Sequence, residues 1–198
     1  VNFAQVLNLG TLSNFEAYSG TGAVSNIGTS QFTGDVGTSV GAISGFDLPT
    51  TFNGFPQNAN AITAQAKIDM LRVYIHLSDI FVTNTSHAAA FGSGETITPG
   101  VYSIAGAGSL AGSITLDGQG NPNAAFIIKF EGGFSAGASS TIVLSNGTRA
   151  CNVFWIAEGA ISIGASSITK GTLIAHPGAI TVGANGNLEG RKIGRAHV

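Results

Sequence analysis

A short motif recurs along the chain and limits the possible folds more than any other feature. Each copy reads glycine, a small residue, an aliphatic residue or phenylalanine, and then serine or threonine. The six copies begin at Gly22, Gly41, Gly112, Gly132, Gly159 and Gly178. Three of the five intervals between them are 19 or 20 residues. That length holds three strands of four or five residues joined by tight turns, so the motif predicts an all-β solenoid with three sides.

The 71-residue interval between Gly41 and Gly112 contains a different pattern. From about residue 60 to 82, small and apolar residues recur at helical spacing, and Asn58 or Asn60 is placed to cap the N-terminus. We expect one long helix packed along a solenoid face rather than a membrane or partner helix. The expected core-facing residues are Ala64, Ile68, Leu71, Ile75 and Val82, with Met70, Tyr74 and Leu77 widening the stripe.

Composition restricts the partners of this chain. Only 9% of the 198 residues are charged, against about 25% in a typical soluble protein. The net charge of −2 and the lack of a basic cluster exclude nucleic acid as a partner. No apolar run approaches the roughly 20 residues that cross a bilayer. The single cysteine, Cys151, excludes an internal disulfide and a cysteine metal cluster. We expect a monomer without metal or cofactor, with Cys151 as a buried free thiol.

Four phrases carry a resemblance to a known family: 33–37 (TGDVG), 43–46 (ISGF), 116–124 (LDGQGNPNA) and 152–155 (NVFW). In this order, and with the helix between the second and third, they are similar to the ice-binding proteins built on a discontinuous right-handed β-helix (the DUF3494 family), and most to members from cold-adapted bacteria. The resemblance covers residues 9–191. It implies one β-helical domain with the helix along one face, an extracellular location and adsorption to ice. The first two coils can then lie beside the last ones.

The chain departs from the family at two places. Relatives often have a second cysteine after the helix, where this chain reads His87-Ala-Ala-Ala-Phe91, so Cys151 has no partner. The family also continues through at least one more strand pair beyond Arg191. Residues 193–198 resemble the translation of a common sequencing adapter. We therefore expect a domain over 1–191, a truncated C-terminus and a non-native tail over 192–198. The absent signal peptide is expected to be removed or truncated.

The repeated motif also predicts a binding surface. Alternate residues of a strand point to opposite sides, so the aliphatic residue of each motif faces the core while the small residue and the hydroxyl face outward. This requires Phe134 to point inward. Stacked coils would then present a flat array without charges, suited to ice. The candidate ice-binding residues form two columns: Ala23, Ala42, Ser113, Gly133, Ala160 and Ala179, and Ser25, Ser44, Thr115, Ser135, Ser162 and Thr181. The corner residues Thr38, Ser39, Ser139, Ser166 and Asn185 are further candidates.

Other functions have less support in the sequence. Residues 37–41 match the G-x-S-x-G pattern of hydrolases, but Ser39 lies between two expected strands instead of before a helix. Glu131 and Glu158 occupy equivalent repeat positions and could form a stacked carboxylate pair, as in a polysaccharide-active β-helix enzyme. His76, His87 and His176 have no evident Asp partner and no metal-ligand spacing. An adhesin-like or exopolysaccharide-binding solenoid is the main alternative. The predicted face offers no exposed aromatic grid for a sugar, so we expect a protein that is not an enzyme.

Overall fold

The computed structural model describes residues 7–26, 31–46 and 51–194. It contains one helix and twenty strands, and every strand pair is parallel. The strands are β1 (Phe15–Ser19), β2 (Val24–Ser25), β3 (Gln31–Phe32), β4 (Asp35–Thr38), β5 (Ile43–Ser44), β6 (Thr51–Phe52), β7 (Pro56–Asn58), β8 (Ala90–Gly92), β9 (Glu95–Ile97), β10 (Gly100–Ile104), β11 (Gly108–Ala111), β12 (Ser113–Asp117), β13 (Phe126–Phe130), β14 (Phe134–Ala136), β15 (Thr141–Ser145), β16 (Val153–Ala157), β17 (Ile161–Ile163), β18 (Ile168–Ala175), β19 (Ile180–Val182) and β20 (Asn187–Gly194).

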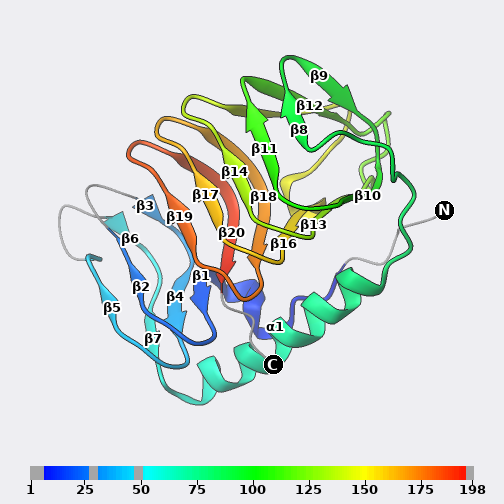
Figure 1. Ribbon diagram of the computed structural model, residues 1–198. Coiled ribbons are helices and arrows are strands. Elements are labelled where there is room, and N and C mark those ends of the chain that lie inside the picture. Colours follow the sequence, from blue (N-terminus) through cyan, green and yellow to red (C-terminus); the bar gives the residue numbers. More distant parts are fainter. Residues whose placement is uncertain (1–6, 27–30, 47–50, 195–198) are drawn as a thin grey trace.

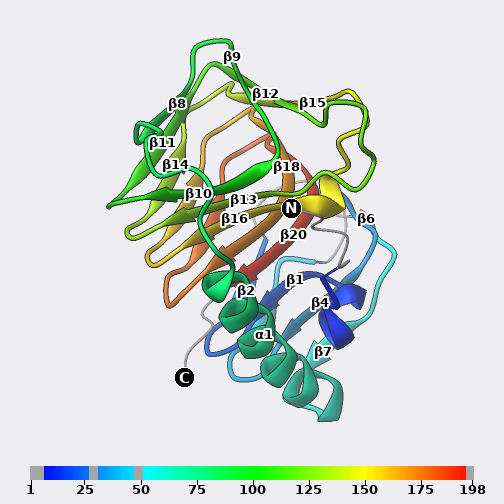
Figure 2. The same ribbon diagram turned by 90° about the vertical axis from the view of Figure 1, so that its right-hand side faces the viewer.

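The strands form the three sides of a solenoid (Figures 1 and 2). The helix face consists of β10, β13, β16, the second halves of β18 and β20, and then β1, β4 and β7. The small-residue face is the five-stranded sheet β8, β11, β14, β17 and β19. The third face contains β9, β12, β15 and the first halves of β18 and β20, together with the pair β3 and β6. The three-sided solenoid predicted from the motif is confirmed.

The order of the coils in space differs from their order in the sequence. The last strand, β20, pairs with the first, β1, through Ala17–Lys192 and Tyr18–Ile193. β1 in turn pairs with β4, and β4 with β7. The coils of residues 15–58 therefore continue the stack beyond the C-terminal strand, as predicted (Figure 1).

The helix α1 (Ala61–Asp79) lies along the helix face. Asn60 caps its N-terminus by accepting the Thr63 amide, while the Thr63 hydroxyl accepts the Asn60 amide. These two hydrogen bonds satisfy two backbone amides that have no partner within the helix. At the other end, Lys129 of β13 donates to the carbonyl oxygens of Ser78 and Ile80 at 2.8 and 2.7 Å. A cation at the C-terminus also complements the helix dipole, so both ends are fixed.

The stripe of α1 that faces the solenoid matches the prediction only in part, because Met70 and Leu77 are buried as expected but others are not. Ile68 and Ile75 are 55% and 48% exposed, and Ala64 is exposed as well. Apolar residues occur on several sides of this helix, so spacing alone did not identify the buried one. The solenoid instead covers a stripe with alternating intervals of three and four residues: Thr63, Ala66, Met70, Val73 and Leu77. Their apolar partners on the helix face are Val101, Ile127, Phe154, Ile156, Ile174 and Ile193.

A matched pair of lysine substitutions tests this assignment. We expect Leu77→Lys to lower the free energy of unfolding by more than about 3 kcal/mol, because it removes a core side chain and buries a charge. We expect Ile75→Lys to change it by less than about 0.5 kcal/mol, as usual for surface substitutions. Urea unfolding followed by circular dichroism measures both. Equal effects of the two substitutions would contradict the assignment.

Asp69 is a charged residue on the buried stripe, at 5% exposure. Its carboxylate accepts the Thr11 amide at 2.8 Å and receives side-chain bonds from Gln65 and Arg72. Burial on its own raises the pKa of Asp69, but the bonds from Thr11 and Gln65 and the charge of Arg72 outweigh it and leave the pKa below the usual 3.8. Asp69 thereby ties α1 to the 3-10 turn η1 (Gly10–Asn14) that precedes β1.

Asp69→Ala is expected to lower the free energy of unfolding by about 1–3 kcal/mol, because the Thr11 amide loses its charged acceptor. The lowered pKa gives the pH dependence of this contribution. It is fully present above the unfolded pKa, near 3.8, and is lost as the pH falls through the lower folded pKa. Denaturant titrations of parent and variant at pH 7 and pH 2.5 should therefore give stabilities that converge in acid. A constant difference would contradict this origin.

One expectation near the C-terminal half was wrong. Cys151 is exposed instead of buried, because the 3-10 turn η2 (Ala150–Asn152) lifts it off the core before β16 begins at Val153. Residues 192–194, which we assigned to the tail, complete β20 and pair with both β18 and β1, while the non-native origin of the tail stays a prediction. Ile193 is 1% exposed. Residues 195–198 lie outside the described residues.

Candidate functional site

The small-residue face is an unbroken parallel sheet in which equivalent residues stack. Ser109 pairs with Ala90 and with Ser135, Ser135 with Ser162, and Ser162 with Thr181. All five side chains are exposed. Since neighbouring strands lie about 4.8 Å apart, the sheet presents a straight column of one methyl group and four hydroxyl groups. A second column of small residues precedes it, with Gly133, Ala160 and Ala179 immediately before β14, β17 and β19.

Large side chains directly beneath this column hold the strands in place. Phe134 is 2% exposed and points inward, as the predicted orientation required. Its ring stacks on Trp155 of β16, with centroids 5.1 Å apart and an angle of 11° between the planes. Ile161 and Ile163 of β17 are buried in the same cluster. The outer columns therefore rest on a packed interior, which limits their motion.

Glycines at the corner before each strand let successive coils approach closely. A Cβ atom on Gly178 would lie 2.4 Å from the Ala160 nitrogen, and one on Gly159 would lie 2.9 Å from the Gly133 nitrogen. Any side chain there would separate the coils. The first glycine of the motif thus keeps the second column flat, which explains its recurrence.

Of the twelve predicted residues, six lie together on the small-residue face: Gly133, Ser135, Ala160, Ser162, Ala179 and Thr181. Two more, Ser25 and Ser44, pair with each other on the two-stranded sheet of β2 and β5. Ala23 and Ala42 precede them and are exposed too. β2 and β5 follow β1 and β4 just as β17 follows β16, so they occupy the same side of the solenoid in the N-terminal coils.

Ser113 and Thr115 do not belong to this surface. They lie on β12, which pairs with β9 and β15 on the third face. Gly112 adopts a φ of +69° and turns the chain around a solenoid corner, so its motif begins one side later than the other copies. The tetrapeptide matches the pattern, but its glycine here serves a different corner.

Ala90 and Ser109 also lie in the exposed column of the small-residue face, although the motif did not predict them. The motif required an aliphatic or aromatic residue before the hydroxyl, whereas Ser109 follows Gly108. Gly108 is needed because Phe130 fills the interior at this point, and a Cβ atom on Gly108 would lie 2.1 Å from the Phe130 ring. The spacing of 19 residues between positions 90 and 109 was the signal that could have found them.

The predicted corner residues divide into two groups. Ser139, Ser166 and Asn185 share a positive φ of 57–59° and stack at the corner between the small-residue face and the third face. The Ser139 amide donates to Ala165 O and the Ser166 amide to Ala184 O. These three residues are exposed at the rim of the face. Thr38 is fully buried and donates to Gly22 O, and Ser39 bonds to Tyr18 and Thr63 O, so neither is available to a ligand.

The other two sides are less uniform than the small-residue face. α1 covers the helix face. The third face carries an ion pair, Lys170 to Glu189 at 2.6 Å, on adjacent strands. It also exposes Val143 and Ile168. Only the small-residue face combines registered strands with outward side chains that are all small and uncharged.

The possible catalytic groups are engaged in structural contacts. Ser39 lies between β4 and β5 and donates to Thr63 O at 2.9 Å, so it is not the exposed nucleophile of a hydrolase. The Glu158 carboxylate accepts from Tyr74 of α1 and lies 3.3 Å from His176 Nδ1. Burial and the bond to Glu158 raise the pKa of Tyr74 to about 12, which keeps its hydroxyl protonated as a donor.

The histidines do have acidic neighbours, which the sequence did not indicate: His176 contacts Glu158, and His87 Nε2 lies 3.3 Å from Glu95. Each imidazole also stacks on an aromatic ring, Tyr74 or Phe91, at 4.1 Å. Across residues 7–26, 31–46 and 51–194, no three His, Cys, Asp or Glu side chains gather as a metal site would require. In the same ranges no helix is long and apolar enough to span a bilayer.

Comparison with known proteins agrees with this architecture. The family model described as ice-binding-like matches residues 18–198. An ice-binding protein of Nostoc sp. (strain HG1) is 32% identical over 183 residues, which is 92% of this chain and 67% of the relative. An ice-binding protein of Flavobacterium frigoris (strain PS1) is 26% identical over 98% of this chain and 73% of its own length.

Solved structures give the same result. The crystal structure of an ice-binding protein from an Antarctic Flavobacteriaceae bacterium is 38% identical, with a TM-score of 0.90 over 96% of this chain. The chain spans 44% of the length of that protein. The ice-binding protein of the Antarctic ascomycete Antarctomyces psychrotrophicus is 29% identical, with a TM-score of 0.77, covering 96% of this chain and 95% of its own. On its fold, its repeats and these matches, the chain belongs to the ice-binding-like family.

Proposed function

We propose that the protein binds ice by adsorbing through the small-residue face. The supporting observation is the registered, uncharged array on that face, which contrasts with the covered helix face and the charged third face. The proposed contact residues are the exposed column Ala90, Ser109, Ser135, Ser162 and Thr181, and the flanking Gly133, Ala160 and Ala179. Ala23, Ser25, Ala42 and Ser44 extend the contact on β2 and β5.

The physical requirements of ice favour such a surface. Ice offers a repeating lattice of oxygens without charges or pockets, so a binder needs regularly spaced contacts that order water without holding it in a different geometry. Along a strand, alternate outward residues lie about 6.6–7 Å apart, and neighbouring strands about 4.8 Å apart. Methyl and hydroxyl groups in that grid order water only slightly. Each contact is weak, but a rigid array loses little entropy when all contacts form together.

Adsorption of this kind slows the growth and recrystallisation of ice, because the front must bulge between bound molecules. The proposed role needs no catalysis, cofactor or partner chain, and the protein acts as an extracellular monomer where ice forms. A polysaccharide-binding role would need exposed aromatic rings on the binding face. The strongly exposed rings Phe55 and Phe81, at 72% and 85%, lie in segments that flank α1 instead.

The direct test is thermal hysteresis and ice shaping by the purified protein in a nanolitre osmometer, with retention of labelled protein on an ice hemisphere as an independent readout. We expect faceted crystals, a measurable hysteresis gap and labelled ice. Circular dichroism first establishes that the sample is folded. A folded sample that neither shapes ice nor adsorbs to it would refute the proposal and favour an adhesin-like solenoid.

A further inference from the structure

Among residues 7–26, 31–46 and 51–194, the third face has no strand at the seam where β20 meets β1. On the helix face the order is β20, β1, β4 and β7. β4 and β7 are each preceded in the chain by a third-face strand, β3 and β6, and the second half of β20 is preceded by its own first half. β1 is preceded by the 3-10 turn η1 instead. In the described part of the chain, the layer of β1 therefore has a helix-face strand but no third-face strand.

Both walls of the space at this seam are unpaired strand edges. Asn187 donates its amide to Ser167 O on β18, so the alternation of a strand turns the amide and carbonyl of Leu188 toward the empty side. β1 pairs with β20 only from Lys192 onward. On the opposite wall, β3 pairs with β6, and Phe32 O accepts the Asn53 amide. The backbone groups of Gln31 then face the space. Within the described residues, no strand pairs with either edge.

Glu16 partly substitutes for the missing backbone. It lies at the bulge of β1, where the register with β4 shifts. Its carboxylate accepts the amides of Thr33 and Gly34 at 2.6 and 3.1 Å. A side-chain acceptor thus caps the end of β3 where a strand carbonyl would otherwise bond. The rest of the edge has no such substitute.

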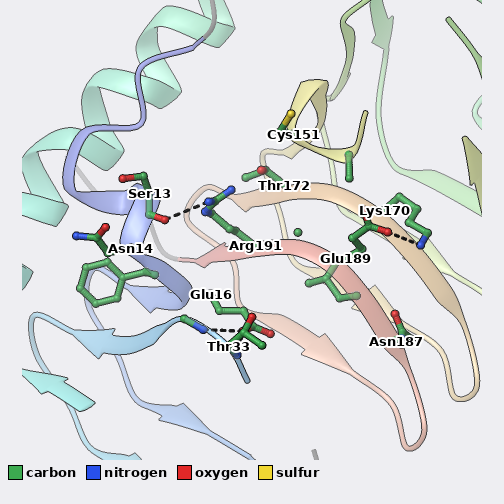
Figure 3. A pocket seen from close by; sticks show the side chains of 15 residues that line it. Ser13, Asn14, Glu16, Thr33, Cys151, Lys170, Thr172, Asn187, Glu189 and Arg191 are labelled. Carbon is green, nitrogen blue, oxygen red and sulfur yellow. Dashed lines mark hydrogen bonds and ion pairs between the residues drawn. The ribbon is translucent and has the colours of Figure 1, made fainter. Parts of the chain in front are cut away.

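The space is a groove of about 760 Å³, which we call the seam groove. Figure 3 shows Glu16 and Thr33 on one side of it and the β20 residues Asn187, Glu189 and Arg191 on the other. Arg191 donates to Ser13 O across one end at 3.1 Å. The lining is mostly charged, hydroxyl and amide side chains, which suits a peptide better than a compact apolar ligand.

A cation lies behind this groove in the solenoid interior. Lys192 pairs with the buried Ala17, and its ammonium lies 5.1 Å from the centroid of the Phe32 ring. Burial lowers the pKa of Lys192, although the charge of Glu16 opposes this. Within the described residues the ammonium makes no hydrogen bond. A half-buried cation with only a ring and a distant carboxylate as partners lacks an acceptor.

We propose that the seam groove is a strand-acceptor site, which binds an extended peptide segment parallel to β20 and β3 as the third-face strand of the β1 layer. Its backbone bonds to Leu188 on one side and Gln31 on the other. Its outward side chains are small or polar, and its inward side chain offers a carboxylate or other acceptor to Lys192. This site lies on a different side of the solenoid from the proposed ice-binding surface.

Two probe peptides test the site. One has the sequence of residues 138–146, which contains β15, and the other carries the change Ile142→Asp at its buried position. We expect millimolar peptide to slow amide hydrogen exchange of Leu188 at least about tenfold, as pairing of an open edge does. The aspartate peptide should bind about tenfold more tightly, because it forms a charge-assisted bond with Lys192.

The variant Lys192→Met supplies the control. It should prefer the unchanged peptide, because the buried aspartate then has no cation beside it, while the parent prefers the aspartate peptide. Unchanged exchange at Leu188 with either peptide would overturn the proposal, and so would protection confined to the end strands β7 and β10. Protection that rises with protein concentration in the absence of peptide would identify a second copy of this chain as the occupant and would also overturn it. None of these readouts depends on ice.

Discussion

Replacing Ser162 with tyrosine should remove most of the thermal hysteresis, while the same change at Ser113 should leave it intact. Ser162 occupies the middle of the exposed column, between Ser135 and Thr181. A phenol ring there would stand several ångströms above the face and hold the neighbouring strands away from the lattice. Because adsorption depends on many contacts forming together, we expect a loss of roughly tenfold or more.

Ser113 is the matched control because its motif is the same but its face is different. It is exposed on β12, opposite Thr141 of β15. Ala160→Tyr should behave like Ser162→Tyr, because Ala160 lies in the second column. Circular dichroism and melting curves establish that all three variants fold. If Ser113→Tyr were the inactive variant, ice adsorption would have to be assigned to the third face.

Trp155→Ala should cause a large loss of stability, about 3–5 kcal/mol. Trp155 is fully buried and stacks on Phe134, with Phe91 against its edge at 6.3 Å. Its indole nitrogen also donates to Lys170 O at 3.0 Å. Truncation would leave a large cavity beneath the small-residue face and an unpaired buried carbonyl. Denaturant unfolding of parent and variant measures the loss.

Trp155→Phe separates the two contributions. It keeps an aromatic ring against Phe134 but removes the donor to Lys170, so we expect an intermediate loss of about 1–2 kcal/mol. Both variants should retain ice shaping at temperatures where they remain folded, because their outward residues are unchanged. A fully stable Trp155→Ala protein would mean that the aromatic stack does not support the face.

The sequence predicted the solenoid because its period has a direct physical origin. A coil of three short strands has a fixed length, and the corner glycines recur wherever coils approach closely. The existence and the cap of α1 followed from equally local signals at Asn60 and Thr63. The buried side of α1 did not, because this helix has apolar residues on several sides and the solenoid selects among them.

The binding face was predicted only in part, because the motif describes a single coil and not the contacts between coils. Ser135, Ser162 and Thr181 stack as expected, because each follows an inward aromatic or aliphatic residue. Ser109 was missed because it follows a glycine instead of the aliphatic or aromatic residue of the motif. Position 108 is a glycine because the Phe130 ring fills the interior space that a side chain would need there. Ser113 was included wrongly, because a tetrapeptide does not specify which corner its glycine turns. Both errors concern contacts between coils, which a single coil does not encode.

The pairing of β20 with β1 has a consequence for how the chain reaches this state during synthesis. An ordinary repeat protein can add coils one after another as they leave the ribosome. Here the N-terminal coils are made before β20, the strand on which they rest through Tyr18–Ile193 and Ser19–Gly194. Closing a loop of that length is entropically slow. The edge of β1 that pairs with β20 therefore stays unpaired until β20 has been made. The C-terminal coils are the part of the solenoid that can assemble first.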